Sequence, residues 1–175
     1  MLDWLIALTQ QQKKRMFVRL VKGAYWDSEI KHAQILGLPD YPVFTEKYLT
    51  DANYLICAKK IFDNLEYIIP QFATHNAITA SSIIALAKGR DFEFQKLHGM
   101  GGDLHSELIK NHPVRIYAPI GKMEDLLAYL MRRLLENGAN TSFVHQVSSK
   151  NKIEMIYDLY EKIRTENNNF FSQSF

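Results

Sequence analysis

Segments with strand-type and helix-type hydrophobic patterns alternate along most of the chain, and this alternation limits the fold more than any other feature. Alternation of this kind is typical of an α/β protein with a parallel sheet and helices packed on its faces. A barrel and an open doubly wound sheet both fit, and both place their chemistry at the carboxyl ends of the strands. The patterns predict strands at residues 16–21, 67–75, 92–100 and 114–120, and helices at residues 2–11, 27–37, 45–62, 78–89, 103–112, 126–138 and 153–164.

The four predicted strands end in segments that carry more than ordinary turn residues. These segments read VKGAYW, FATHNA, LHGMGG and YAPIG, and each offers a glycine, a hydroxyl, an amide, a histidine or a charged group. This pattern favours four loops that line one active-site pocket. The glycines at 99–102 do not match G-x-G-x-x-G, and no GK[ST] motif is present, which weakens the open-sheet dinucleotide-binding interpretation.

The helix predicted at 126–138 places two adjacent arginines on a narrow polar stripe. Tyr129, Arg132, Arg133 and Glu136 follow the i, i+3, i+4, i+7 spacing of one helix face. Two interpretations are open at this point. The stripe is either a solvated face with an ion pair, or a clamp in which two guanidinium groups bind the carboxylate of a small substrate.

The composition is that of one ordinary globular domain. Of 175 residues, 47% are hydrophobic and 23% are charged, which is enough apolar material for a core. A net charge of +2, with basic residues dispersed among acidic ones, does not favour nucleic acid as a partner. The single cysteine, Cys57, excludes an internal disulfide and fits a reducing compartment, and no metal-ligand spacing is present, so we expect no metal.

Four blocks of sequence closely resemble the proline dehydrogenase domain of the bacterial proline utilisation flavoenzymes. They are RLVKGAYWDSEIK (19–31), FATHNA (72–77), FEFQKLHGMG (92–101) and YAPIGKMEDLLAYLMRRLLENGANTSFV (117–144), in that family's order and spacing. The resemblance implies a (β/α)8 TIM-type barrel with FAD at the carboxyl ends of its strands. It also implies oxidation of L-proline to pyrroline-5-carboxylate, electron transfer to a quinone, and a cytoplasmic location with peripheral contact at the inner membrane.

The resemblance assigns roles to individual residues. Arg132 and Arg133 are expected to clamp the proline carboxylate, and Tyr117 and Tyr129 to wall the pocket. Arg19 would place positive charge near the reactive part of the flavin, although it could also be purely structural. The expected cofactor-binding residues are Arg19, Val21, Lys22, Gly23, Ala24, Tyr25, Trp26, Lys47, Thr74, His75, Asn76, Gln95, Leu97 and Glu136.

The chain also departs from the family pattern. Ile78 stands where the family often has histidine, Gly102 where an acidic residue is common, and GKMEDLL (121–127) replaces a loop that usually carries histidine. The larger departure is length, because a complete barrel takes about 200–250 residues or more. We therefore expect residues 1–147 to be the C-terminal half of a barrel, followed by a helical and polar extension at 148–175.

Three hypotheses about function remain. The chain is a proline dehydrogenase fragment that acts when the missing N-terminal half of the barrel, or a second copy, completes it. Alternatively, it is a noncatalytic half-barrel or assembly module that holds no flavin. A third hypothesis is an aldolase in which Lys22, at a strand end, forms a Schiff base.

Overall fold

The computed structural model describes residues 1–23 and 25–140, with the backbone alone for Asp125 and residues 134–140. Met1–Glu136 forms one compact unit. The helix expected at 153–164, the predicted cofactor residue Ala24 and the side chain of Glu136 lie outside the described residues.

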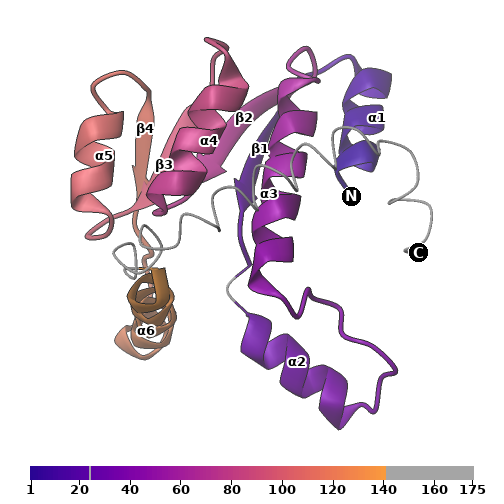
Figure 1. The fold of residues 1–175 in the computed structure, drawn as a ribbon, viewed down its shortest axis with the longest axis vertical. Helices are drawn as coiled ribbons and strands as arrows, with labels where there is room; N and C mark the ends of the chain where they lie inside the picture. Colours follow the sequence, from indigo (N-terminus) through magenta and orange to yellow (C-terminus); the bar gives the residue numbers. More distant parts are fainter. Residues whose placement is uncertain (24, 141–175) are drawn as a thin grey trace. The chain divides into compact units, whose positions relative to one another are not determined.

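The centre of this unit is a parallel sheet of four strands (Figure 1). The strands are β1 (Met16–Val21), β2 (Ile68–Ala73), β3 (Glu93–Leu97) and β4 (Val114–Tyr117), in the spatial order β1-β2-β3-β4. All three pairings are parallel. The predicted α/β class and all four predicted strands are confirmed, although β2, β3 and β4 are shorter than their hydrophobic patterns because the chain leaves the sheet before each polar loop.

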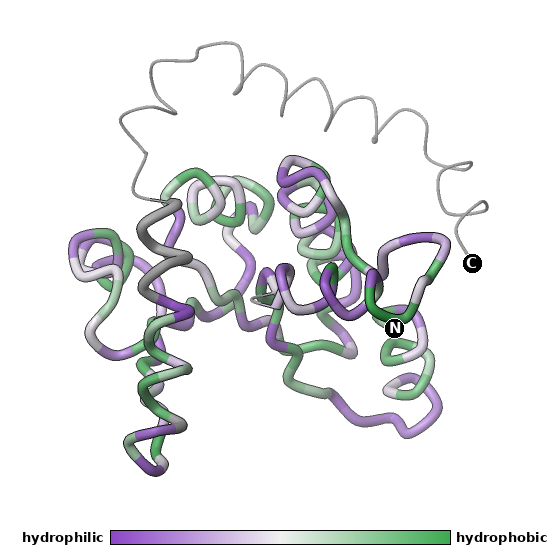
Figure 2. The backbone as a smooth tube through the Cα atoms, turned by 90° about the horizontal axis from the view of Figure 1, so that it is seen from below, coloured by the Kyte–Doolittle hydropathy of each residue, from purple (hydrophilic) through white to green (hydrophobic). Residues whose placement is uncertain are grey.

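The described helices also match the predicted ones, with shifts of a few residues at their ends. They are α1 (Leu2–Gln12), α2 (Trp26–Ile35), α3 (Lys47–Phe62), α4 (Ala77–Ala87), α5 (Gly102–Leu108) and α6 (Met123–Asn140). Hydrophobic and hydrophilic residues alternate along the coloured part of α6 in Figure 2, as expected for an amphipathic helix. Within the part of the chain that is described, no helix is long and apolar enough to cross a membrane.

The hydrophobic core lies between one face of the sheet and the helices α3 and α4, which lie side by side in Figure 1. Phe72 of β2 and Phe94 of β3 are completely buried on this face. The rings of Phe62, Phe72 and Phe92 pack with centroids 5.2–5.8 Å apart. Aromatic contacts at these distances add to the free energy gained by burying the rings.

The other face of the sheet carries polar side chains and is not covered by these helices. The sequence predicts that residues 16–21 form a buried strand, and this prediction is wrong for one face of β1. Phe17 is 60% exposed and Val21 is 47% exposed, whereas Val18 and Leu20 pack against the core. Successive side chains of a strand point to opposite faces, so a continuous apolar run is buried on both faces only where both are covered.

Candidate active site

Three of the predicted site residues meet across the open face of the sheet. Arg19 of β1 donates from Nε to Oε1 of Gln95 on β3 at 2.8 Å, and from Nη2 to the hydroxyl of Tyr117 on β4 at 3.2 Å. The Arg19 guanidinium carbon also lies 5.1 Å from the centroid of the Tyr117 ring. The parallel strands bring together residues that are 76 and 98 positions apart in the sequence.

Tyr117, which contacts Arg19, lies close to Tyr129 of α6. Burial, followed by the influence of Tyr129, raises the pKa of the Tyr117 hydroxyl, so this hydroxyl stays protonated at neutral pH. The guanidinium carbon of Arg133 lies 4.6 Å from the centroid of the Tyr129 ring. An aromatic face and a protonated hydroxyl together suit a small ligand that has both apolar and polar edges.

The two arginines of α6 hold buried hydrogen-bond donors that are not satisfied. Arg132 packs its guanidinium over the ring of Tyr25, with 5.1 Å from the guanidinium carbon to the ring centroid. Nε of Arg132 and Nη1 of Arg133 are buried and have no hydrogen-bond partner among the described residues. Leaving charged donors buried without acceptors is costly, and the pair is therefore suited to an anionic ligand such as a carboxylate.

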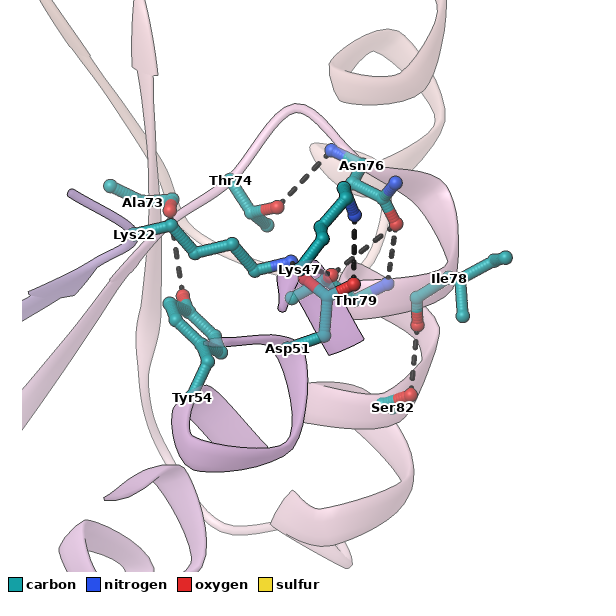
Figure 3. A network of polar contacts seen from close by, with 10 residues as sticks. All are labelled: Lys22, Lys47, Asp51, Tyr54, Ala73, Thr74, Asn76, Ile78, Thr79 and Ser82. Atoms are coloured by element: carbon teal, nitrogen blue, oxygen red, sulfur yellow. Dashed lines mark hydrogen bonds and ion pairs between the residues drawn. The ribbon is translucent and has the colours of Figure 1, made fainter. Parts of the chain in front are cut away.

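A second polar cluster follows the ends of β1 and β2 (Figure 3). Lys22 Nζ lies 2.6 Å from Oδ1 of Asp51 and 3.0 Å from the hydroxyl of Thr79, and Lys47 Nζ lies 2.8 Å from Oδ2 of Asp51. Burial alone would raise the pKa of Asp51, but the two ammonium groups hold it below its usual value. Asp51 thus brings together the predicted residues Lys22 and Lys47.

Asp51 was missed in the sequence analysis, although one signal could have found it. It lies four residues after Lys47, the spacing at which oppositely charged side chains pair on a helix. Its contact with Lys22 argues against the aldolase hypothesis. A Schiff-base lysine must be a neutral amine, and an ion pair with a carboxylate stabilises the protonated form.

The predicted segment Thr74, His75 and Asn76 connects β2 to α4. The side-chain oxygen of Asn76 caps α4 by accepting a hydrogen bond from the Thr79 amide at 2.9 Å. His75 Nε2 accepts a longer bond, 3.4 Å, from the Leu97 amide. Burial, followed by the nearby His105 and three cationic side chains, lowers the pKa of His75 to about 4, so this histidine is neutral at pH 7.

His105 of α5 is a further residue that the sequence analysis missed. Its ring lies 5.4 Å from that of His75, centroid to centroid, and its Nδ1 is 2.9 Å from the Gly101 carbonyl oxygen. The side chain is almost completely buried, and burial lowers its pKa. Sequence patterns do not predict this contact, because the two histidines lie on different elements.

Several predicted cofactor residues do not join either cluster. The Trp26 indole donates to the Phe44 carbonyl at 2.8 Å, and Leu97 is fully buried. A Cβ atom added at Gly23 would meet no atom within 4 Å, so the described residues leave open space there. Val21 and Tyr25 are exposed, and the ring of Tyr25 contacts the Arg132 guanidinium. Their roles toward a cofactor stay predictions.

Comparison with known proteins identifies the family. A sequence profile described as proline dehydrogenase matches residues 1–146. This chain belongs to the proline dehydrogenase family. It is 53% identical over 158 residues to the bifunctional protein PutA of Klebsiella aerogenes, covering 84% of this chain and 12% of that protein. It is 35% identical over 140 residues to proline dehydrogenase 2 of Bacillus subtilis (strain 168), covering 77% of this chain and 41% of that protein.

Solved structures of this family also match the fold. A Bradyrhizobium japonicum proline utilization A (PutA) mutant superposes with a TM-score of 0.75 at 55% identity, covering 82% of this chain and 15% of that chain. PutA from Bdellovibrio bacteriovorus, in a structure described as inactivated by N-propargylglycine, gives a TM-score of 0.75 at 38% identity, covering 86% and 16%. The proline dehydrogenase domains of these proteins are TIM-type barrels, which confirms the predicted barrel class. The chain spans only 12–16% of the PutA proteins named here.

Proposed function

We propose that this chain supplies the C-terminal half of a proline dehydrogenase barrel that oxidises L-proline to pyrroline-5-carboxylate with FAD. Family membership supports the reaction class. The observation that carries the proposal is the pair of buried, unsatisfied donors on Arg132 and Arg133, because a substrate carboxylate would satisfy both. The N-terminal half of the barrel, or a second copy of this chain, would complete the site.

The described residues indicate how proline would be held. The guanidinium groups of Arg132 and Arg133 would bind its carboxylate, and the rings of Tyr117 and Tyr129 would contact its methylene groups. One relative fits this ligand chemistry. A solved PutA structure is described as inactivated by N-propargylglycine, which, like proline, is a secondary amine with a carboxylate.

The described residues also fit a flavin dinucleotide. Lys22 and Lys47 would neutralise its phosphate groups, and Asn76 would contribute its amide at the start of α4. Arg19 and Gln95 would face the isoalloxazine ring. When bound, FAD supplies the acceptor for the hydride that leaves the ring carbon next to the proline nitrogen. The protein's own task is to orient the substrate and exclude water, and no nucleophilic side chain is required.

The same proposal includes an electron acceptor and a location in the cell. We expect a quinone to reoxidise the flavin, with the complete protein in the bacterial cytoplasm and in peripheral contact with the inner membrane. Proline-dependent reduction of a soluble quinone analogue by the completed barrel would test the acceptor.

The clamp is tested by changing Arg132 and Arg133 together to Met in the completed, FAD-loaded barrel. Two charge-assisted contacts are lost, so we expect kcat/KM for proline to fall by about 100-fold or more. Lys110→Met serves as the control, because Lys110 pairs with Glu107 on the surface of the unit. Unchanged turnover at low proline concentration in the double variant would contradict the clamp. A wild-type protein that cannot be loaded with flavin would favour the noncatalytic module instead.

A further inference from the structure

The carboxylate of Glu93, on β3, is the centre of a polar network on the open face of the sheet. Its Oε1 accepts hydrogen bonds from Gln71 Nε2 at 2.7 Å, Gln95 Nε2 at 2.9 Å and Arg115 Nε at 2.8 Å. Its Oε2 accepts from Arg115 Nη2 at 2.9 Å. Four donors from three strands therefore converge on one carboxylate that is largely shielded from water.

The network fixes the orientation of the Gln95 side chain. A carboxylate can only accept hydrogen bonds, so Gln95 must turn its NH2 group toward Glu93. A guanidinium can only donate, so Gln95 must turn its oxygen toward Arg19. The two requirements agree. The Gln95 NH2 group donates to Glu93, and the Gln95 oxygen accepts from the Nε–H group of Arg19.

The surroundings show why Glu93 rather than solvent holds Gln95. Gln95 is only 6% exposed, which leaves its amide little access to water. Arg115 is mostly exposed, whereas the Glu93 side chain that it binds is not. A surface arginine thus anchors the outer end of the network, and the inner end reaches Arg19 on the far side of β2.

We propose that Glu93 is a positioning residue that acts through Gln95 to hold the Arg19 guanidinium in place. The relevance of this placement to catalysis rests on the proposed function, since Arg19 is the residue expected to face the flavin. The placement itself is a property of the folded chain and can be measured without flavin or proline.

The competing explanation is that Glu93 and Arg115 form a structural ion pair and nothing more. Three variants separate the two. Glu93→Met removes the acceptor for Gln95, Glu93→Gln keeps an oxygen that Gln95 can use, and Arg115→Met keeps the Glu93 carboxylate. If the pair is only structural, all three substitutions should change the mobility of the Arg19 guanidinium equally, because each removes the ion pair. If Glu93 positions Arg19, only Glu93→Met should increase that mobility strongly.

The measurement is the exchange of the Arg19 Nε–H proton with water, followed by nuclear magnetic resonance in the full chain. Arg19→Lys identifies the signal by removing it. We expect exchange about tenfold faster in Glu93→Met, and within about twofold of the wild type in Glu93→Gln and Arg115→Met. Glu107→Gln, on the surface of α5, is the matched control and should change nothing.

Two outcomes would overturn the proposal: equal acceleration in the three variants, or no acceleration in Glu93→Met. Should Glu93→Met fail to fold, Glu93→Asp draws the carboxylate back by one methylene and carries the same expectation. In the FAD-loaded barrel, Glu93→Met should lower kcat with little change in KM for proline. A normal exchange pattern in a protein that binds no flavin would remove the proposed function and leave the positioning role intact.

Discussion

At the residue scale, His75 shows how the fold alters the chemistry of a side chain. It is partly buried, contacts His105, and has Lys96, Arg133 and Arg19 close enough to disfavour its charged form. These influences lower its pKa from 6.5 to about 4. A neutral ring can accept the hydrogen bond from the Leu97 amide, which links the loop after β2 to the end of β3.

This shift predicts a pH dependence of stability. Between about pH 6.5 and pH 4 the unfolded chain binds a proton at His75 that the folded chain does not, so the free energy of unfolding falls as the pH is lowered through this range. His75→Gln keeps an acceptor for the Leu97 amide but does not titrate. We expect its free energy of unfolding, measured in urea at about pH 7 and about pH 5, to fall less than that of the wild type. His32→Gln, on the exposed side of α2, is the control; an equal fall in His75→Gln and the wild type would contradict this assignment.

At the element scale, the junction between β3 and α5 depends on a glycine that no other residue can replace without strain. Gly101 has φ +60°, and a Cβ atom there would lie 2.8 Å from Cδ2 of His75 and 2.9 Å from Nδ1 of His105. Gly99 has φ +81° but open space around it. Alanine substitutions at these two positions therefore distinguish the cost of backbone strain, which both share, from the cost of a steric clash, which occurs only at Gly101.

Gly101→Ala should destabilise the unit more than Gly99→Ala. Both substitutions force alanine into the left-handed region, at a cost of about 1–2 kcal/mol. Only Gly101→Ala also displaces the two histidines, which adds about 1–3 kcal/mol. Urea denaturation of both variants measures the difference, and equal losses of stability would show that the histidines give way freely.

The Asn76 cap at the start of α4 is expected to contribute to stability. Asn76→Ala removes the acceptor for the Thr79 amide and should lower the free energy of unfolding by about 1 kcal/mol. Asn76→Asp retains the cap and adds a negative charge at the helix N-terminus, so it should match or exceed the wild type. A loss in Asn76→Asp as large as that in Asn76→Ala would mean that the cap is not what stabilises this position.

At the scale of the whole unit, the uncovered face of the sheet and its two edge strands dominate the behaviour expected of the chain. Among the described strands, β1 and β4 each pair on one side only. Phe17 projects from β1 on the face away from the helices. In a closed barrel this face is filled by side chains from the remaining strands, and exposed edges and apolar patches promote association.

We therefore predict that the chain by itself associates with other copies, and that Phe17→Glu weakens this association about tenfold, since burial of a phenylalanine side chain is worth about 1.5–3 kcal/mol. Sedimentation equilibrium over a range of concentrations measures the effect. Ile35→Glu, at an exposed position on α2, is the matched control. Adding the N-terminal half of a related barrel should replace self-association by a one-to-one complex that takes up FAD. A strictly monomeric wild-type chain would contradict the prediction.

The amino-acid sequence by itself determined the element order, the parallel α/β class and the family. Each of these depends on local information: hydrophobic periodicity over a few turns, and short blocks such as FATHNA and the arginine pair of α6. The roles assigned to individual site residues and the boundary at residue 147 stay predictions, because they concern ligands and segments outside the described residues.

Only the tertiary structure decided which side chains meet. Arg19 reaches Gln95 and Tyr117 because the strand order and parallel register align them, and Asp51 joins Lys22 to Lys47 because α3 packs beside the end of β1. The same holds for the exposure of Phe17 and for the convergence of four donors on Glu93. Hydrophobic periodicity reports which face of an element is apolar, but it does not contain the spatial order of strands that brings distant residues within hydrogen-bonding distance.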